Sequence, residues 1–251
     1  HQNTNKLNNI MLSTAEIGAY GRAIDSLTTL AQNDLHTLWS HAAKQRPKQA
    51  RDLLLEIMPA LVDQYGSAAA AIANEWYRDM RLDQDIPGDA PTVQTSLTPQ
   101  GEIDDSVRFS AGALYAGNPD IALSYLTGAL IRYVSDGARA QIADMTWSDP
   151  EAMGWERRTR NPQACNFCVM LTMNECYYRS QGTASFGAHD NCKCVAVPAW
   201  DPTSREVPAK AYALAARHKT DKGRKRHREL VSSWIDTHQE ELTQWRTRPI
   251  E

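Results

Sequence analysis

All five cysteines of the sequence lie between residues 165 and 194, and their spacing is typical of a metal site. A Cys-x-x-Cys pair, Cys165 and Cys168, presents two thiolates toward one point. A His/Cys knuckle about 20 residues later can complete a tetrahedral site of nitrogen and sulfur ligands, which suits zinc. The sequence therefore predicts a structural metal, with zinc as the candidate, and the candidate ligands are Cys165, Cys168, His189, Cys192 and Cys194.

The ligand set and the role of the cysteines stay open at this point. Cys165 and Cys168 are favoured as the first pair, but His189, Cys192 and Cys194 offer three ligands for the two remaining positions. Cys176 lies outside the pattern and is interpreted as a plain buried thiol. The alternatives to a metal are cysteines that pack as small hydrophobic residues or form disulfides, and a cytoplasmic origin argues against disulfides.

The same residues offer little for catalysis. A catalytic zinc is disfavoured, because the sequence has no His-Glu-x-x-His motif and no Glu placed beside the cluster as a general base. A nucleophilic arrangement can be written from Cys165 or Cys168 with His189 and Asn191, but clustered Cys and His also satisfy a metal site. Gly-x-Ser-x-Gly, P-loop and Gly-x-Gly-x-x-Gly motifs are absent. The residues therefore favour a role other than catalysis.

A second candidate site is the most basic stretch of the chain. Nine Lys or Arg residues lie between Arg205 and Arg228, against only Glu206 and Asp221. Such a segment can contact DNA phosphates without sequence preference, or an acidic protein surface, although a solvated helix face gives the same pattern. No interleaved aromatic residues suggest base stacking. The candidate DNA- or partner-binding residues are Lys222, Arg224, Lys225, Arg226 and Arg228.

Charge is also divided along the chain. Residues 1–156 contain 11 Lys and Arg against 20 Asp and Glu, whereas residues 157–251 contain 16 against 10. The two parts are predicted to face different partners, unless they are simply unequal surfaces of one protein.

The elements that position these residues are predicted to be mostly helical. Apolar residues recur every three or four positions over 11–38, 54–65, 67–81, 102–115 and 121–145, which is the period of one helix face. Gly66 is expected to separate two helices, and Gly117-Asn118-Pro119 another two. Residues 83–101 are predicted to form a solvent-exposed loop, and Asp149-Pro150-Glu151 to begin a further helix as its N-cap and first turn.

Composition changes after Arg160, where Cys, Tyr, Asn and Gly crowd together between short apolar runs. We predict a mainly α protein with four parts: residues 1–10 disordered or an extension, 11–156 a helical domain, 157–204 a small Cys/His-rich α+β module, and 205–251 a basic C-terminal helical tail. With no apolar run of ~18 residues and no signal peptide, we expect a soluble protein without membrane contact, made in a cytoplasm.

Several motifs, taken in order, resemble one known family. They are Trp155-Glu156-Arg157-Arg158, the run from Cys165 to Leu171, Tyr178-Arg179-Ser180 and the run from His189 to Pro198, with Tyr65-Gly66, an Ala run and Trp76-Tyr77 upstream. Together they resemble the Mu F-like minor capsid proteins, which act in head morphogenesis of actinobacterial tailed phages. Cys176 departs from the family, whose members usually carry a small or apolar residue there.

The resemblance implies a virion protein, made in the host cytoplasm and present in few copies inside the capsid near the portal. Its partners would be the portal protein or the major capsid protein, and its role assembly or genome delivery. Relatives are often labelled capsid maturation proteases, so a protease or another head-associated hydrolase is the alternative function. A zinc module that binds nucleic acid independently of any virion is a third possibility.

Overall fold

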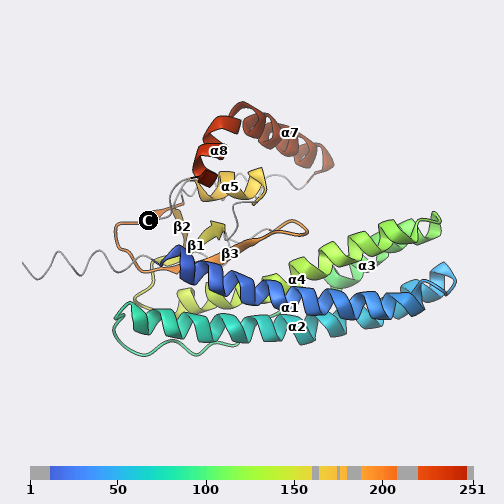
Figure 1. The fold of residues 1–251 in the computed structure, drawn as a ribbon, viewed down its shortest axis with the longest axis horizontal. Coiled ribbons are helices and arrows are strands. Elements are labelled where there is room, and N and C mark those ends of the chain that lie inside the picture. The colour runs from blue at the N-terminus through green and yellow to red at the C-terminus, as the bar shows by residue number, and fades with distance from the viewer. Residues whose placement is uncertain (1–11, 160–163, 174–175, 180–187, 208–219, 248–251) are drawn as a thin grey trace, which may run out of the picture.

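A computed structural model of the chain describes residues 12–159, 164–173, 176–179, 188–207 and 220–247. The predicted extension, residues 1–10, lies outside the described residues. The described chain begins with long helices that run side by side in Figure 1: α1 (Thr14–Ala42), α2 (Pro47–Asp83), α3 (Gln100–Tyr115) and α4 (Pro119–Ser148). No helix in the described ranges is both long and apolar enough to cross a membrane.

The ends of these helices follow local sequence signals. Ser13 and Glu16 form a capping box at the start of α1, in which each side chain accepts a hydrogen bond from the other residue's backbone N–H. Pro47 and Pro119 occupy the first turns of α2 and α4, where a missing N–H costs nothing. Gly117 has a φ of 76° and turns the chain from α3 into α4, as predicted.

The predicted break at Gly66 was wrong, because α2 continues through this residue. Gly66 is buried where α2 crosses α4, opposite Gly137. A Cβ at Gly137 would lie only 2.4 Å from the backbone oxygen of Gly66. The glycine therefore serves a close helix crossing, and the hydrogen bonds of a long helix outweigh its low propensity.

The helix predicted to begin at Asp149-Pro150-Glu151 was also wrong. Asp149 ends α4, and the chain then turns into strand β1 (Gly154–Thr159). Its buried carboxylate accepts hydrogen bonds from Tyr77 Oη at 2.7 Å and Arg81 Nε at 2.9 Å, both from α2. The same carboxylate accepts a hydrogen bond from the backbone N–H of Glu151. The sequence pattern that predicted a helix N-cap therefore forms a turn, and its Asp takes part in a buried ion pair.

Residues 84–99 contain no helix or strand, which confirms the predicted irregular stretch. The stretch is nevertheless anchored. Ile86 and Val93 pack against the core, and the Arg81 guanidinium donates to the backbone oxygens of Ile86, Pro87 and Gly88.

The Cys/His-rich part is a small α+β unit, as predicted. It contains β1, α5 (Asn166–Thr172), β2 (Cys176–Tyr178), β3 (Cys194–Ala199) and β4 (Arg205–Glu206). The strand order is β3-β1-β2-β4, with β1 antiparallel to β2 and β3, and β2 parallel to β4.

The sheet shares one apolar core with the long helices. Trp155, Val197 and Trp200 belong to the same buried cluster as residues of α1, α2 and α4, and β3 packs against α4. Strand β1 also runs across the predicted boundary between residues 156 and 157. The Cys/His unit is therefore held directly on the helical layer.

The chain ends in two helices, α7 (Asp221–Thr237) and α8 (Gln239–Thr247), which confirms the predicted helical C-terminus. Residues 208–219 of the predicted tail lie outside the described residues. Leu242 is buried against Cys168, Cys192 and Cys194, with Trp234 packed at the edge of the same cluster. In Figure 1, α7 and α8 lie beyond α5, on the side of the sheet away from α1 and α2. The observed fold is thus mainly α with a small sheet, as predicted.

Candidate metal centre

The first two cysteines are positioned by the start of α5. Cys165 is its N-cap residue, and its sulfur accepts a hydrogen bond from the backbone N–H of Cys168 at 3.4 Å. Because Cys168 lies one turn into the helix, both sulfurs face the same side. Cys168 is buried and Cys165 is exposed.

A tight turn positions the other three candidate ligands, which are His189, Cys192 and Cys194. The backbone N–H of Cys192 donates to the oxygen of His189 at 3.1 Å, and Asn191 adopts a left-handed conformation with a φ of 61°. Cys194 then begins β3. Cys192 and Cys194 are two residues apart in extended chain, so their side chains share one face, and both are buried.

The structure brings the five predicted ligands together in two overlapping groups. Cys165, Cys168 and His189 form one group, Cys168, Cys192 and Cys194 form the other, and ligand atoms within each group lie within 4.8 Å of one another. His189 Nε2 is 3.0 Å from the sulfur of Cys165, and the sulfurs of Cys168 and Cys192 are 3.5 Å apart. None of the five cysteines forms a disulfide. Cys176 is half-buried in β2 and belongs to neither group.

The donors within each group have a spacing close to that of ligands around a tetrahedral ion. With Zn–S bonds of about 2.3 Å and Zn–N bonds of about 2.0 Å, tetrahedral ligand atoms lie roughly 3.5–3.8 Å apart. The separations Cys165–His189, Cys168–His189 and Cys168–Cys192 are 3.0–3.5 Å. A site with four ligands would draw on both groups, which share Cys168. His189 Nδ1 donates to the backbone oxygen of Asp190 at 2.7 Å, which leaves the Nε2 lone pair facing the thiols. The cluster could therefore hold a metal ion.

Electrostatics favour a cation at this point. A hydrogen bond from Cys168 lowers the pKa of Cys165 to about 5, and the same contact raises the pKa of Cys168. The pKa of Cys192 is also lowered, first by its contact with Cys168. Burial opposes the charge on His189, but the hydrogen bond to Asp190 and the contact with Cys165 raise its pKa overall. Cys165 and Cys192 are thus favoured as thiolates, the form that binds metals, whereas the raised pKa values of Cys168 and Cys194 favour the neutral thiol.

The long helices brace the knuckle from below, which the sequence analysis missed. Arg139 of α4 is buried and donates to the backbone oxygens of Cys192 and Cys194 at 2.9–3.1 Å. Its signal in the sequence is a charged residue between Ala138 and Ile142, in a stretch of α4 where most neighbouring residues are buried.

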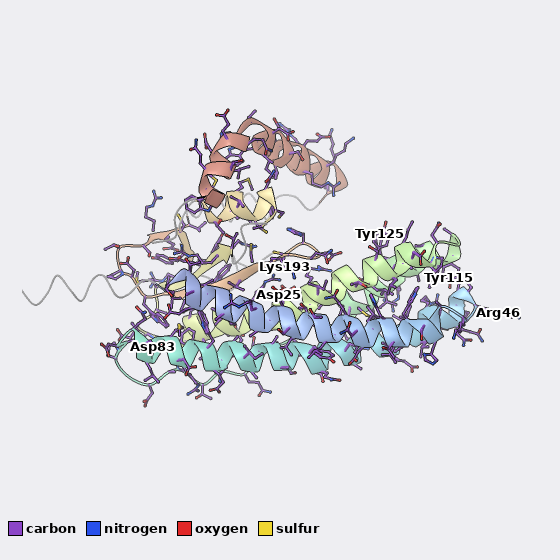
Figure 2. The ribbon with its side chains drawn as sticks, viewed as in Figure 1. Asp25, Arg46, Asp83, Tyr115, Tyr125 and Lys193 are labelled. Atoms are coloured by element: carbon purple, nitrogen blue, oxygen red, sulfur yellow. The ribbon has the colours of Figure 1, made fainter. Side chains whose placement is uncertain are left out.

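Further contacts hold the same turn on the helical layer. Arg132 of α4 pairs with Asp190 at 2.9 Å, and Lys193 pairs with Asp25 of α1 at 2.6 Å (Figure 2). Gly128 allows the close approach, since a Cβ there would lie 3.0 Å from the Cβ of Asp190. The turn that carries the second ligand group is therefore anchored by two helices.

The nucleophilic arrangement considered from the sequence is only partly assembled. Cys165 and His189 are in contact, but His189 Nδ1 is bonded to the oxygen of Asp190. The side chain of Asn191 instead lies against Gly128 of α4.

The predicted basic residues lie on α7. The side chains of Lys222, Lys225, Arg226 and Arg228 are exposed, and that of Arg224 lies outside the described part of the structure. Lys225 is 4.0 Å from Glu229 in an exposed pair that contributes little to stability. The basic side chains are therefore accessible to a large anionic partner.

Comparison with known proteins gave one family. A family model described as VG15 protein matches residues 11–220, which is most of the chain. The curated proteins and the solved structures gave no match.

Proposed function

Because the chain belongs to the VG15 protein family, a family of phage proteins, we propose that it is a minor capsid protein acting in head morphogenesis. Its place would be inside the capsid near the portal, with the portal protein or the major capsid protein as partner. The resemblance of several motifs to those of Mu F-like proteins supports this role.

The observation that carries the proposal is an exposed aromatic pair at the free end of the helical layer. Phe109 of α3 is 70% exposed and Tyr125 of α4 is 42% exposed, and their rings lie 5.2 Å apart. Tyr125 lies at the end of the helical layer away from the sheet (Figure 2). Neighbouring exposed rings on a soluble surface are typical of a protein contact. They suit a protein that docks on another head component.

Co-expression with the portal and coat proteins of the same phage tests this role. The wild-type chain should co-purify with portal or assembled heads, and the double variant Phe109→Ser/Tyr125→Ser should be depleted from them. Leu82→Ser is the matched control, because Leu82 is 76% exposed but lies near the end of α2, away from the aromatic pair. This variant should co-purify with portal or heads as the wild type does. A wild-type chain absent from both portal and heads would refute the proposal.

Zinc is proposed as the metal of the Cys/His cluster, with a structural role. The donor set of thiolates and one imidazole suits zinc, and a structural ion would fix a module whose sheet is small. Elemental analysis of protein purified without added metal tests this, and about one zinc per chain is expected.

The basic helix α7 is proposed to contact packaged DNA without sequence preference. Replacing Lys222, Lys225, Arg226 and Arg228 with Gln should weaken DNA binding and make its salt dependence shallower by roughly one unit per lost phosphate contact. An equal salt dependence of DNA affinity in variant and wild type would mean that these side chains of α7 are only solvent-exposed and do not contact DNA.

A capsid maturation protease is the second candidate, favoured by the 3.0 Å contact between the exposed Cys165 and His189. Cleavage of co-expressed coat protein that is lost in Cys165→Ser, while Cys176→Ser retains it, would support the protease. Uncleaved coat with normal incorporation of the wild type would exclude it.

A further inference from the structure

The position of Arg139 relative to the Cys/His cluster is unusual for a helix residue. Its side chain is 3% exposed, yet it carries a permanent positive charge into the interior of the protein. Arg139 Nε donates to the backbone oxygen of Cys194 at 3.1 Å, and one terminal nitrogen donates to the oxygens of Cys192 and Cys194 at 3.1 and 2.9 Å. The other terminal nitrogen pairs with Asp136 at 2.7 Å.

This fork reaches the ligand residues themselves. The backbone oxygens that accept from Arg139 belong to Cys192 and Cys194, on either side of Lys193. The guanidinium therefore fixes the direction of the chain at both ligands. A lysine could offer only a point charge there, whereas the planar fork holds two oxygens at once.

Charge gives Arg139 a second effect on the cluster. A divalent ion held by three thiolates and one neutral imidazole carries a net charge of about −1, and four thiolates would give about −2. Burying such a net charge is costly without an opposite charge nearby. The guanidinium of Arg139 is hydrogen-bonded to the backbone of Cys192 and Cys194, so its positive charge lies beside the cluster.

The geometry points to Arg139 as the positioning residue of the metal centre: from α4, it orients the chain at Cys192 and Cys194 and offsets the negative charge of the loaded cluster. This inference rests on the proposed metal site. The helical layer is then a part of that site, because Cys192 and Cys194 are held by a residue of α4 that precedes them by more than 50 residues in the chain.

Titration with Co²⁺ tests the inference, since cobalt takes the place of zinc and its thiolate charge-transfer and d–d bands report ligand number and geometry. Arg139→Gln should weaken Co²⁺ and Zn²⁺ binding about 10–100-fold, the usual effect of removing a group that orients a metal ligand. Its cobalt spectrum should also change. Arg139→Lys keeps the charge and should recover part of the affinity but not the full wild-type spectrum.

Gly137→Ala is the matched control for simple loss of stability. It lies in the same helix and disturbs the crossing with α2, opposite Gly66, without a contact to the cluster. Its Co²⁺ affinity and spectrum should equal those of the wild type. Circular dichroism verifies that each variant retains its helices, and if Arg139→Gln does not fold, the comparison of Arg139→Lys with Gly137→Ala decides.

The outcomes separate the inference from the metal site. If the wild type binds neither Co²⁺ nor Zn²⁺, the proposed metal site fails and the inference fails with it. If the wild type binds the ion and the Arg139 variants bind it with unchanged affinity and spectrum, the metal site stands and the role of Arg139 is overturned. Equal weakening by Gly137→Ala would also overturn it, because general destabilisation would then explain the effect.

Discussion

The buried ion pair between Arg81 and Asp149 joins α2 to the end of α4. The two side chains are 4% and 0% exposed, and the Asp149 carboxylate also accepts from Tyr77 Oη. Because Asp149 stands at the end of α4, just before the chain enters β1, this contact fixes the path from one part of the fold to the other. We predict that Asp149→Ala is among the most destabilising changes outside the Cys/His cluster.

The expected magnitude follows from what the change leaves behind. Removing one partner of a buried ion pair costs about 3–5 kcal/mol, because the other charge stays buried without compensation. The two terminal nitrogens of Arg81 still donate to the backbone oxygens of Ile86, Pro87 and Gly88, so of its nitrogens only Nε loses its acceptor. We therefore expect the lower end of the range, about 3 kcal/mol, a large share of a typical total of about 5–15 kcal/mol.

Urea unfolding followed by far-ultraviolet circular dichroism measures this loss. The control is Asp52→Ala, which removes an exposed carboxylate paired with Lys48 and Arg51 and should barely change the midpoint. Replacing both partners, as in Arg81→Met/Asp149→Leu, should recover much of the stability lost in Asp149→Ala. A loss below about 1 kcal/mol for Asp149→Ala, as for exposed pairs, would refute the argument that burial makes this pair important.

The same pair predicts a pH dependence. Burial acts to raise the pKa of Asp149, but its hydrogen bonds from Arg81 and Tyr77 hold that pKa below the usual range. A group with a lowered folded-state pKa contributes stability that is complete above its unfolded pKa, about 3.9, and is lost as pH falls through the folded value. Acid should therefore destabilise the wild type more steeply than Asp149→Ala below about pH 4. Parallel acid unfolding curves would contradict this.

Other substitutions test the helix crossing and the docking of the C-terminus. Gly137→Ala should cost about 1–3 kcal/mol through overpacking, whereas Gly112→Ala, where an added Cβ meets nothing within 4 Å, should stabilise α3 by about 0.5–1 kcal/mol; urea midpoints that move the same way would contradict this. Leu242→Ala should lower the hydrogen-exchange protection of α7 and α8 while leaving α1 and α2 unchanged, since Leu242 belongs to the cluster that joins α7 and α8 to the Cys/His unit. Unchanged protection in α8 would disprove that docking role.

Local signals were enough to predict the helices. The apolar period of α1 and α3 and the turn at Gly117-Asn118-Pro119 each depend on residues within one or two turns of the chain. The two errors have a different origin. Gly66 suits a helix end as well as a close crossing, and Asp149 suits an N-cap as well as a buried ion pair. The role of Gly66 depends on Gly137, and the role of Asp149 depends on Arg81. Neither partner is near in sequence.

The candidate site divides in the same way. Cys165 and Cys168 are separated by one helical turn, so their convergence could be predicted from spacing, and the knuckle after His189 likewise. The braces could not be predicted, because Arg139 and Asp25 meet the knuckle from distant helices. The identity of the metal stays a prediction, since the same donors serve several divalent ions.

The arrangement of charge makes different surfaces of the chain available to different kinds of partner. In Figure 1 the sheet unit and α5 lie between the acidic helical layer and α7. The exposed Lys and Arg side chains belong to α7. A polyanion approaching α7 therefore meets positive charge without first meeting the acidic helices, whose field is screened over about 10 Å at 0.1 M salt. A protein partner can at the same time reach Phe109 and Tyr125 at the free end of the layer. Because these two surfaces do not overlap, binding at one leaves the other open, as the proposed role of linking DNA to a shell component requires.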